Sequence, residues 1–350
     1  MLNIDGSYGE GGGQLLRTSL SLSCLLRLPF RIVNLRLKRP KPGLQPQHLT
    51  AVLAAQQIAS AQVEGAQLNS TSLSFAPATI IGGHFDFDVS RIAPSAGSTS
   101  LILQTILPPL GFAPDPCTIV LKGGTHVPFS PVFEYIQQVF LPSLASLGVD
   151  ASIQIRKAGF YPVGGGEIEA KVNPVEALTA PGQVSRGALT EVSCTSLVSR
   201  LPISIAQRQM QAMVSSLKSV REVNQQAVLE LPSPGPGTCA FALARCEGTL
   251  AGFSSLGKRG KPAEQVGAEA AQALNSFLAS GADLDLHLAD QLLLWLVLSN
   301  GRFQARVQQV TQHLLTNLWV IQQFLSARVE ILGELGQPGL LQGEGVGFGT

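Results

Sequence analysis

The order in which strands and helices alternate limits the possible folds of this chain more than any single motif does. Hydrophobic periodicity predicts strand, helix, strand, helix and strand over residues 2–75. The same order, with a second final strand, is predicted over residues 85–172, and an incomplete third copy over residues 288–332. The copies share a pattern of elements rather than residue identities. The sequence therefore predicts an α/β (α+β) fold of three βαβαββ-type repeats.

The stretch from residue 186 to about residue 282 interrupts this order. It predicts a strand, a helix, a strand, a Pro- and Gly-rich loop, two strands and a final helix. The Gly residues beside Pro181 and Ser280 mark plausible domain boundaries. We therefore expect a smaller α/β domain at residues 186–281, inserted into the third repeat. Residues 1–185 and 282–350 would together form the catalytic repeat domain.

Three further expectations concern the ends of elements. The second strand of the first repeat is predicted over residues 30–37, where apolar and polar residues alternate. The helix over residues 98–110 is expected to end at Pro108 and Pro109. The glycine-rich end, residues 339–350, is expected to form a last short strand and a loose tail.

Composition excludes several classes of protein. The chain of 350 residues is 45% hydrophobic and 13% charged, which is typical of a globular protein with a large core. A net charge of +1 gives no broad positive surface for tracking long nucleic acid, so a nucleic-acid partner would be held locally, for instance at an end. The longest apolar run, residues 292–298, is too short to span a bilayer, so we expect no membrane partner.

The cysteines and the start of the chain predict a cytoplasmic protein. Five cysteines, an odd number without a C-x-x-C pair, argue for reduced thiols and against a disulfide framework or a zinc knuckle. Asp5 and Glu10 interrupt the N-terminal segment, which argues against a signal peptide.

Residues 9–17 form a glycine-rich turn between a short strand and an apolar helix, with the sequence GEGGGQLLR. Consecutive glycines allow backbone N–H groups to approach a ligand, and the positive end of the following helix favours phosphate. Gln14 and Arg17 lie three residues apart, on one face of that helix. The segment matches neither common nucleotide fingerprint, so a plain connecting turn is the alternative interpretation.

A basic loop, residues 36–48, follows the second predicted strand. Arg36 and Arg39 carry planar guanidinium groups that suit phosphate oxygens. Three prolines stiffen the loop, which favours a fixed binding segment. A solvated basic loop is the alternative.

His313 is the candidate reactive residue. It lies at the start of a helix whose apolar face is supplied by other positions, and a neutral imidazole is a competent nucleophile toward phosphorus when its other nitrogen faces an acceptor. Asp290, at the start of the most apolar helix, is a candidate neighbour. The alternatives are a packed or capping histidine and a carboxylate that interacts only with the helix dipole. No cluster of histidine, cysteine and carboxylate residues has the spacing of metal ligands.

Five segments of the chain, taken together, resemble the RNA 3′-terminal phosphate cyclase family. They are residues 10–17, 36–49, 159–166, 289–291 and 313–317. One of these motifs alone is weak, whereas five in order along nearly the whole chain are specific. The resemblance implies three repeats like the C-terminal domain of bacterial translation initiation factor three, as in enolpyruvyl transferases, with a smaller inserted α/β domain.

The resemblance also implies an enzyme, a ligase-type nucleotidyl transferase that uses ATP to convert an RNA 3′-terminal phosphate to a 2′,3′-cyclic phosphate. His313 would become adenylylated, AMP would move to the RNA to give RNA(3′)pp(5′)A, and the 2′-OH would then displace AMP. Glu10 would hold a divalent metal, Mg²⁺ or Mn²⁺, that screens the triphosphate. The residues that would bind ATP and phosphate are Gln14, Arg17, Arg36, Arg39, Gln47, His48, Gln104, Pro131, His287 and Asp290.

Within this set, Pro131 and His287 would face the adenine, and Asp290 would help to orient His313. The family often has a tyrosine where this chain has His287, and a basic residue where it has Ala158. A non-catalytic, cyclase-like protein of ribosome assembly is the alternative function, but such relatives lack the nucleophilic histidine. An enolpyruvyl transferase is a third possibility, which the His313 and Arg36/Arg39 motifs do not match. The sequence leaves the cellular RNA, the preferred metal and the oligomeric state open.

Overall fold

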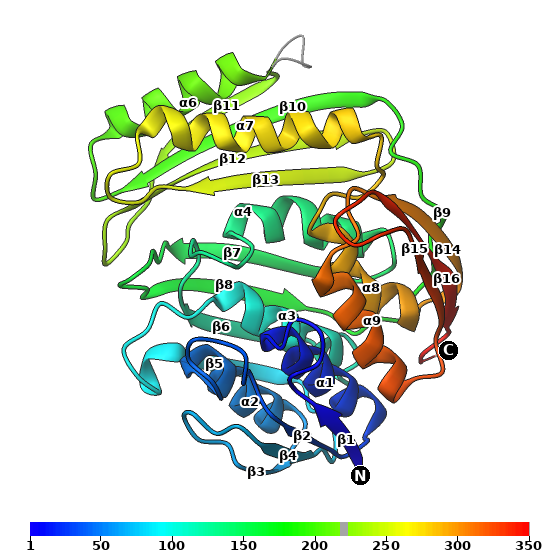
Figure 1. Ribbon diagram of the computed structural model, residues 1–350. Helices are drawn as coiled ribbons and strands as arrows, with labels where there is room; N and C mark the ends of the chain where they lie inside the picture. The colour runs from blue at the N-terminus through cyan, green and yellow to red at the C-terminus, as the bar shows by residue number, and fades with distance from the viewer. Residues whose placement is uncertain (218–222, 350) are drawn as a thin grey trace.

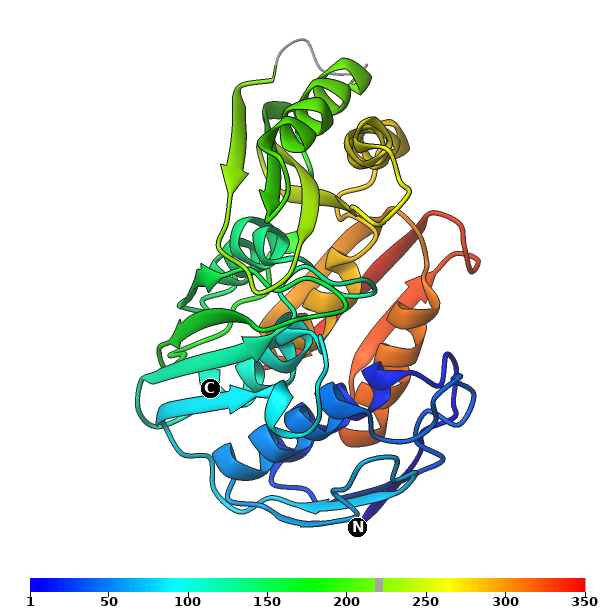
Figure 2. The same ribbon diagram turned by 90° about the vertical axis from the view of Figure 1, so that its left-hand side faces the viewer.

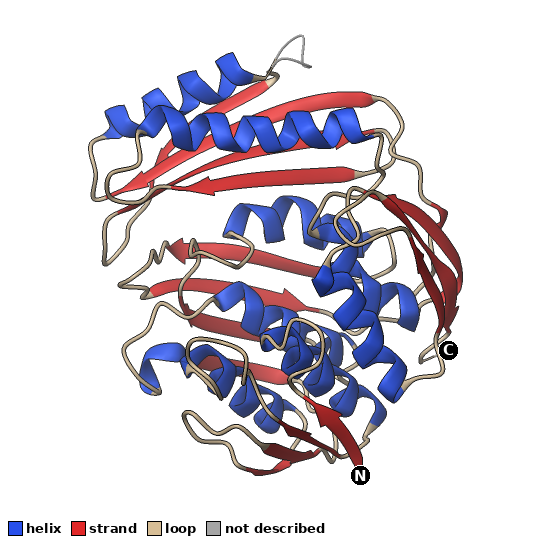
Figure 3. Cartoon of the chain, in the orientation of Figure 1, coloured by secondary structure: helices blue, strands red, loops and turns tan. Residues whose placement is uncertain are grey.

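The computed structural model describes residues 1–217 and 223–349 (Figure 1). Residues 218–222 of the predicted inserted domain and Thr350 of the predicted tail lie outside the described residues. The described chain forms four sheets of four strands each, with helices packed against them (Figure 3).

The first repeat builds the sheet that carries the N-terminus. Its elements are β1 (Leu2–Asp5), α1 (Gly13–Leu26), β2 (Phe30–Val33), α2 (Pro46–Ile58), β3 (Gln62–Glu64) and β4 (Leu73–Ala76). The strand order is β1-β2-β4-β3, with β1 parallel to β2 and the other pairs antiparallel. The sequence analysis missed β3, because this short edge strand has two exposed polar residues and lacks a periodic apolar pattern. It also made β2 too long, since Asn34 and Arg36 adopt positive φ values of 56° and 54° and turn the chain.

The second repeat has the same strand order. Its elements are β5 (Gly83–Asp88), the 3₁₀ turn η1 (Val89–Arg91), α3 (Thr99–Gly111), β6 (Cys117–Gly123), α4 (Phe133–Tyr135), the π-helical segment η2 (Ile136–Phe140), α5 (Leu141–Ala145), β7 (Ala151–Lys157) and β8 (Gly166–Val172). The sheet order is β5-β6-β8-β7. The helix predicted over residues 98–110 is confirmed within one residue at each end, but Pro108 and Pro109 lie inside it rather than after it. Both prolines are buried within the last turn of α3, where packing outweighs their intrinsic cost.

The third repeat is complete and has the same topology. Its elements are β9 (Gly182–Gln183), α8 (Leu288–Leu298), β14 (Asn300–Val307), α9 (Gln312–Phe324), β15 (Arg328–Leu332) and β16 (Gly339–Val346). Its sheet order is β9-β14-β16-β15, with β9 parallel to β14 and the other pairs antiparallel. The predicted fold of three βαβαββ repeats is therefore confirmed. The third copy looked incomplete in the sequence because its first strand, β9, has only two residues and is too short to show periodicity.

An inserted α/β unit separates β9 from α8. Its elements are β10 (Leu189–Ser199), α6 (Ile203–Ser216), β11 (Gln225–Glu230), β12 (Gly237–Cys246), β13 (Leu250–Leu256) and α7 (Ala263–Ser280). The sheet order, β11-β10-β12-β13, differs from that of the repeats, and α6 and α7 cover one face of the sheet (Figure 2). Met213, Leu274 and Phe277 belong to a buried cluster separate from the main core. The predicted inserted α/β fold is confirmed, while its exact limits, 186 and 281, stay a prediction.

The helices of the three repeats meet in the middle of the molecule, with the three repeat sheets on the outside (Figure 2). Helix α1 packs against α2, α3 and α9, and α8 packs against α9. Trp295 of α8, with 1% of its surface exposed, is the largest fully buried side chain of this core. The polar ends of these helices are thereby brought to one place.

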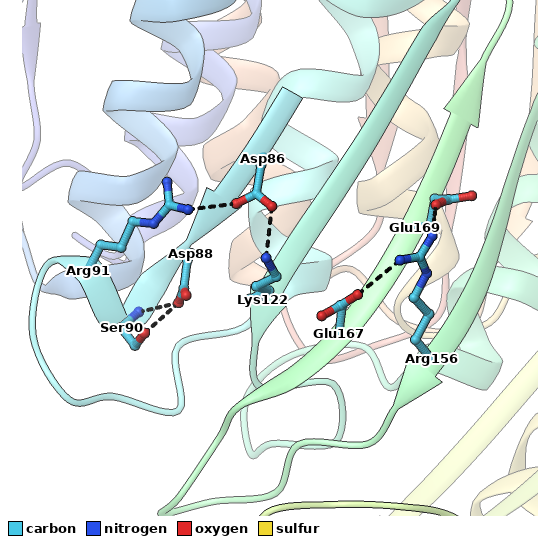
Figure 4. Close-up of polar contacts among 8 residues, drawn as sticks. All are labelled: Asp86, Asp88, Ser90, Arg91, Lys122, Arg156, Glu167 and Glu169. Atoms are coloured by element: carbon cyan, nitrogen blue, oxygen red, sulfur yellow. Dashed lines mark hydrogen bonds and ion pairs between the residues drawn. The ribbon is translucent and has the colours of Figure 1, made fainter. Parts of the chain in front are cut away.

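The outer face of the second sheet carries a network of charged side chains (Figure 4). Asp86 forms ion pairs with Lys122 at 2.8 Å and with Arg91 at 3.1 Å, and Arg156 pairs with Glu169 on the neighbouring strands. Exposed ion pairs of this kind contribute about 0–1 kcal/mol each. The network therefore marks a solvent-facing side of the sheet rather than a source of stability.

Two findings bear on the expected environment of the protein. All five cysteines are free, and four of them are buried. Among the residues that the structure describes, no helix is both long enough and apolar enough to cross a membrane.

Candidate active site

One cavity of about 1140 Å³ lies where the helices of the repeats meet. Every residue for which the sequence predicted a site role lines it. These residues are Glu10, Gln14, Arg17, Arg36, Arg39, Gln47, His48, Gln104, Pro131, His287, Asp290 and His313. The structure thus brings together residues from six separate segments, while their individual roles remain predictions.

The glycine turn allows side chains from elsewhere to approach the start of α1. A Cβ atom at Gly12 would lie 2.7 Å from Arg39 Nη2, and one at Gly13 would lie 2.6 Å from His48 Nε2 and 2.9 Å from Arg17 Nη1. Gly11 has φ +58°, a conformation that L-residues rarely adopt. No described side chain caps α1, so its first N–H groups are available to an anion at the cavity wall.

Replacing Gly13 by alanine is expected to damage the site through this close approach. The added methyl group would force His48 or Arg17 to move, at a cost of about 1–3 kcal/mol, as is usual for overpacking. Chemical denaturation of the variant measures this cost. Adding His48→Ala should relieve part of it, so that the double variant is less destabilised than the sum of the single changes. Strict additivity would show that His48 is not the obstacle.

Glu10 lies between a cation and the candidate nucleophile. Its Oε1 atom pairs with Arg39 Nη2, and its Oε2 atom lies 2.9 Å from Nδ1 of His313. The second contact is not aligned as a hydrogen bond, so Oε2 has no hydrogen-bond partner among the described residues. A proton on Nδ1 is favoured beside this carboxylate, which leaves the lone pair on Nε2. The carboxylate beside Nδ1 is thus that of Glu10, while the charge of Asp290, the neighbour that the sequence indicated, also acts on His313.

A chain of hydrogen bonds joins the helices beneath the cavity. Arg17 Nη2 donates to Gln14 Oε1 at 2.6 Å, and Gln14 Nε2 donates to Thr18 Oγ1 at 3.0 Å. Thr18 Oγ1 donates to Asn317 Oδ1 at 2.7 Å, and Asn317 Nδ2 donates to the backbone carbonyl of Asp290 at 2.8 Å. This chain links α1 to α9 and α8 and fixes the position of the Arg17 guanidinium.

Burial and charge set the protonation states around His313. Partial burial, together with Arg17 and Arg39, lowers the pKa of the half-exposed His313 below its ordinary value, although Asp290 opposes the shift. Burial raises the pKa of Asp290 to about 6, and lowers that of Arg17 to about 10. Oδ1 of Asp290 has no hydrogen-bond partner in the described part of the chain. At neutral pH the imidazole is therefore uncharged, and Arg17 remains a cation.

His48 and Gln47 lie at the start of α2. The backbone N–H of Gln45 donates to His48 Nδ1 at 3.3 Å, which places the proton on Nε2, the atom that faces Gly13. Burial, with help from Arg36 and Arg17, holds the pKa of His48 well below its ordinary value. His48 is thus a neutral N–H donor. Gln47 accepts from the backbone N–H of Ser98 at 3.0 Å, which joins this segment to the start of α3.

Arg36 shapes the basic loop as well as lining the cavity. Its Nη1 atom donates to the carbonyl oxygens of Lys41 at 2.7 Å and of Gly43 at 3.0 Å. Burial lowers its pKa from the ordinary value. The loop is therefore held by an internal contact, as its proline content indicated.

The sequence analysis missed Asp285, which organises another part of the cavity wall. Its buried carboxylate accepts from Tyr135 Oη at 2.9 Å, from the backbone N–H groups of His287 and Leu288 at 2.8 and 2.9 Å, and from that of Gly252 at 3.2 Å. It therefore joins the second repeat, the start of α8 and β13 of the inserted unit. No local motif signals such a role, because its partners are separated in sequence.

The fold and the site define a class of protein. A neutral imidazole beside buried and half-buried arginines and an open helix N-terminus is typical of enzymes that handle phosphoryl groups. The sequence model of the family described as RNA 3′-terminal phosphate cyclase matches residues 8–331. The chain belongs to the RNA 3′-terminal phosphate cyclase family and is an enzyme of that family.

Curated relatives match over nearly the whole chain. The RNA 3′-terminal phosphate cyclase of Pyrobaculum neutrophilum is 41% identical over 350 residues, covering 99% of both chains. Those of Methylococcus capsulatus and Gloeothece citriformis are 43% and 42% identical, covering 96% and 95% of this chain and 94% and 95% of their own.

Among solved structures, the enolpyruvyl transferase NikO from Streptomyces tendae matches 50% of this chain and 33% of its own, at 14% identity and a TM-score of 0.29. This likeness is too weak to support an argument. The assignment of the fold rests on the repeated strand order, and the assignment of the family rests on the sequence matches.

Proposed function

We propose that this enzyme uses ATP to convert an RNA 3′-terminal phosphate to a 2′,3′-cyclic phosphate, through a covalent adenylate on His313. The observation that carries the proposal is the placement of His313. Its Nδ1 atom lies 2.9 Å from a Glu10 carboxylate oxygen, and its ring lies in the same cavity as Arg17 and Arg39. This arrangement leaves a neutral Nε2 atom available as a nucleophile in a chain of the cyclase family.

In the first step, the lone pair of His313 Nε2 attacks the α-phosphorus of ATP. The P–N bond forms, the bond to the bridging oxygen breaks, and pyrophosphate leaves. Negative charge on the phosphoryl oxygens is stabilised by the guanidinium groups of Arg17 and Arg39 and by the Nε2–H of His48. The negative charge of the Glu10 carboxylate, which lies 2.9 Å from Nδ1, favours the imidazolium character that develops during attack.

In the second step, an oxygen of the RNA 3′-phosphate attacks the same phosphorus. The P–N bond breaks, its electron pair returns to Nε2 of His313, and RNA(3′)pp(5′)A forms. In the third step, the neighbouring 2′-oxygen attacks the RNA phosphorus, its proton passes to solvent, and AMP leaves. Each step displaces one group at phosphorus, so the same cationic side chains serve all of them by positioning and charge stabilisation.

Glu10 fits the expected divalent cation. Its buried Oε2 atom has no hydrogen-bond partner among the described residues, and the described chain has no cluster of three or more potential ligands that would form an all-protein site. Mg²⁺ commonly takes one carboxylate and completes its shell with substrate phosphates and water. When bound, Mg²⁺ or Mn²⁺ would supply positive charge that screens the triphosphate.

The part of the cavity around Asp285 is suited to the nucleoside of ATP. Pro131, Tyr135, His287 and Phe253 give this wall an apolar and aromatic character. We propose that Pro131 and His287 face the adenine, and that Gln14, Gln47 and Gln104 position the phosphates. We further propose that the enzyme acts in the cytoplasm, in keeping with its free thiols.

The test is covalent labelling in the absence of RNA. Protein incubated with a divalent metal and ATP labelled at the α-phosphate should retain the label in an acid-labile, base-stable bond, whereas ATP labelled at the γ-phosphate should leave none. The labelling rate should rise with pH and level off at a lower pH than for an ordinary histidine, because the pKa of His313 is lowered and the neutral imidazole is the nucleophile. If folded protein takes up no α-label at any pH from 5 to 9, the proposed nucleotidyl transfer is wrong.

A further inference from the structure

Two aromatic side chains project from the rim of the cavity. Phe129 is 101% exposed and Tyr161 is 69% exposed, and both line the cavity opening. Large aromatic residues usually bury their rings, since burying a phenylalanine side chain stabilises by about 1.5–3 kcal/mol. Phe129 in addition has φ +63°, which is unusual for a bulky residue. An exposed ring and an unfavourable backbone conformation at one position suggest a use in binding.

The loops that carry these rings are held together at their bases. His126 and Phe160 form an isolated parallel β-bridge, and the backbone N–H of His126 donates to the carbonyl of Gly159 at 3.0 Å. The two side chains also stack, with ring centroids 5.1 Å apart. His126 Nε2 lies 2.8 Å from a carboxylate oxygen of the buried Glu134. The residues below the rim are thus packed, whereas Phe129, three residues after His126, and Tyr161, directly after Phe160, are exposed.

We infer that Phe129 and Tyr161 form a stacking platform for the unpaired bases next to the 3′-phosphate of the RNA. The inference rests on the proposed function, because it assumes that the RNA phosphate enters the arginine-lined cavity. The rest of the strand must then leave across the rim. Single-stranded nucleic acids are commonly held by bases stacked on aromatic side chains beside a cationic groove, and stacking tolerates any base. The low net charge of the chain leaves such local contacts as the means of holding the RNA.

The experiment compares Phe129→Asn/Tyr161→Ala with the unaltered protein. Asparagine tolerates positive φ, so the first loop can keep its conformation while losing its ring. At RNA concentrations below KM, cyclisation of a 3′-phosphorylated oligonucleotide should fall about tenfold or more, since each stacked base is worth roughly 1–3 kcal/mol. Adenylylation with ATP alone should change less than twofold. Phe129→Tyr/Tyr161→Phe, which keeps both rings, should behave as the unaltered protein does.

A second arm identifies the ligand as RNA bases. Oligonucleotides with one abasic position among the last three nucleotides are compared with the intact substrate. In the unaltered protein, removal of a stacked base should lower cyclisation as much as removal of the two rings does. In the ring-less variant, removal of the same base should lower cyclisation little further. Leu335→Ala, an exposed apolar residue away from the cavity, should change neither reaction.

The outcomes separate this inference from the proposed function. If no protein forms the adenylate, the proposed function fails first. If adenylylation is normal and the ring-less variant cyclises intact RNA with an unchanged KM, the stacking platform does not exist. Equal losses in adenylylation and in cyclisation would also overturn it, because the rings would then serve ATP or the fold rather than the RNA.

Discussion

The His313→Ala variant is expected to form no covalent adenylate and to lose cyclisation by more than about 10⁴-fold, as is usual when a nucleophile is removed. The effect is large because the proposed P–N bond forms on this imidazole, whose Nδ1 atom lies 2.9 Å from the Glu10 carboxylate. His48 is neutral too, but its Nδ1 atom accepts from the backbone and its proton lies on Nε2. The measurement is retention of α-phosphate label after denaturation, followed by cyclisation assays with RNA.

The same variant should fold normally. His313 lies in the first turn of α9, its side chain is 47% exposed, and alanine is a good helix former. Its unfolding free energy should therefore stay within about 0.5 kcal/mol of the unaltered protein. His84→Ala is a matched control, since His84 is exposed on β5 and does not line the cavity; it should label fully. Label on folded His313→Ala protein would show that another residue is the nucleophile.

The Asp290→Asn variant is expected to stabilise the fold at neutral pH while reducing activity. Burial raises the pKa of Asp290 to about 6 from its ordinary value of 3.8. In the folded protein this carboxyl group therefore binds its proton more tightly than in the unfolded chain, so stability falls as pH rises through that range. The shift corresponds to about 2–3 kcal/mol at pH 7, a cost that a neutral asparagine avoids.

The measurement that decides this prediction is the difference in unfolding free energy between the variant and the unaltered protein as a function of pH. Below about pH 4 Asp290 becomes protonated in both the folded and the unfolded state of the unaltered protein. The variant should then have little advantage in unfolding free energy. The advantage should grow between pH 4 and pH 6 and then remain constant. Adenylylation should fall, because the negative charge that favours the Arg17 cation and would stabilise the positive charge developing on His313 during attack is lost. An equal difference at pH 4 and pH 8 would contradict a buried, titrating carboxyl group.

Much of this molecule could be predicted from local patterns. Hydrophobic periodicity predicted the repeated elements and the inserted unit, because long buried helices and strands carry strong periodic signals. Glycine and proline content marked the turn at residues 9–13 and the stiff loop around Arg36. Elements that depend on pairing partners were missed or misplaced. Examples are β3 and β9, which are held only by neighbouring strands.

The candidate site could be predicted only in part, because some of its residues act through partners that are distant in the sequence. Side chains such as Arg17 and His313 belong to motifs that can be recognised in one segment. Asp285 and Asn317 act through partners in distant segments, so only the folded chain shows what they contact. The orientation of His313 toward Glu10 likewise depends on how the first and third repeats pack, which no sequence spacing determines.

The hydrogen bond between Thr18 and Asn317, which spans 299 positions of the chain, has a consequence for protein synthesis. The glycine turn of the first repeat emerges from the ribosome long before the helix that carries His313. Because domains fold progressively from the N-terminus during synthesis, an incomplete chain can present its arginines without the nucleophile. If His313 is the nucleophile, as proposed, adenylylation requires that α9 has been made and has packed against α1.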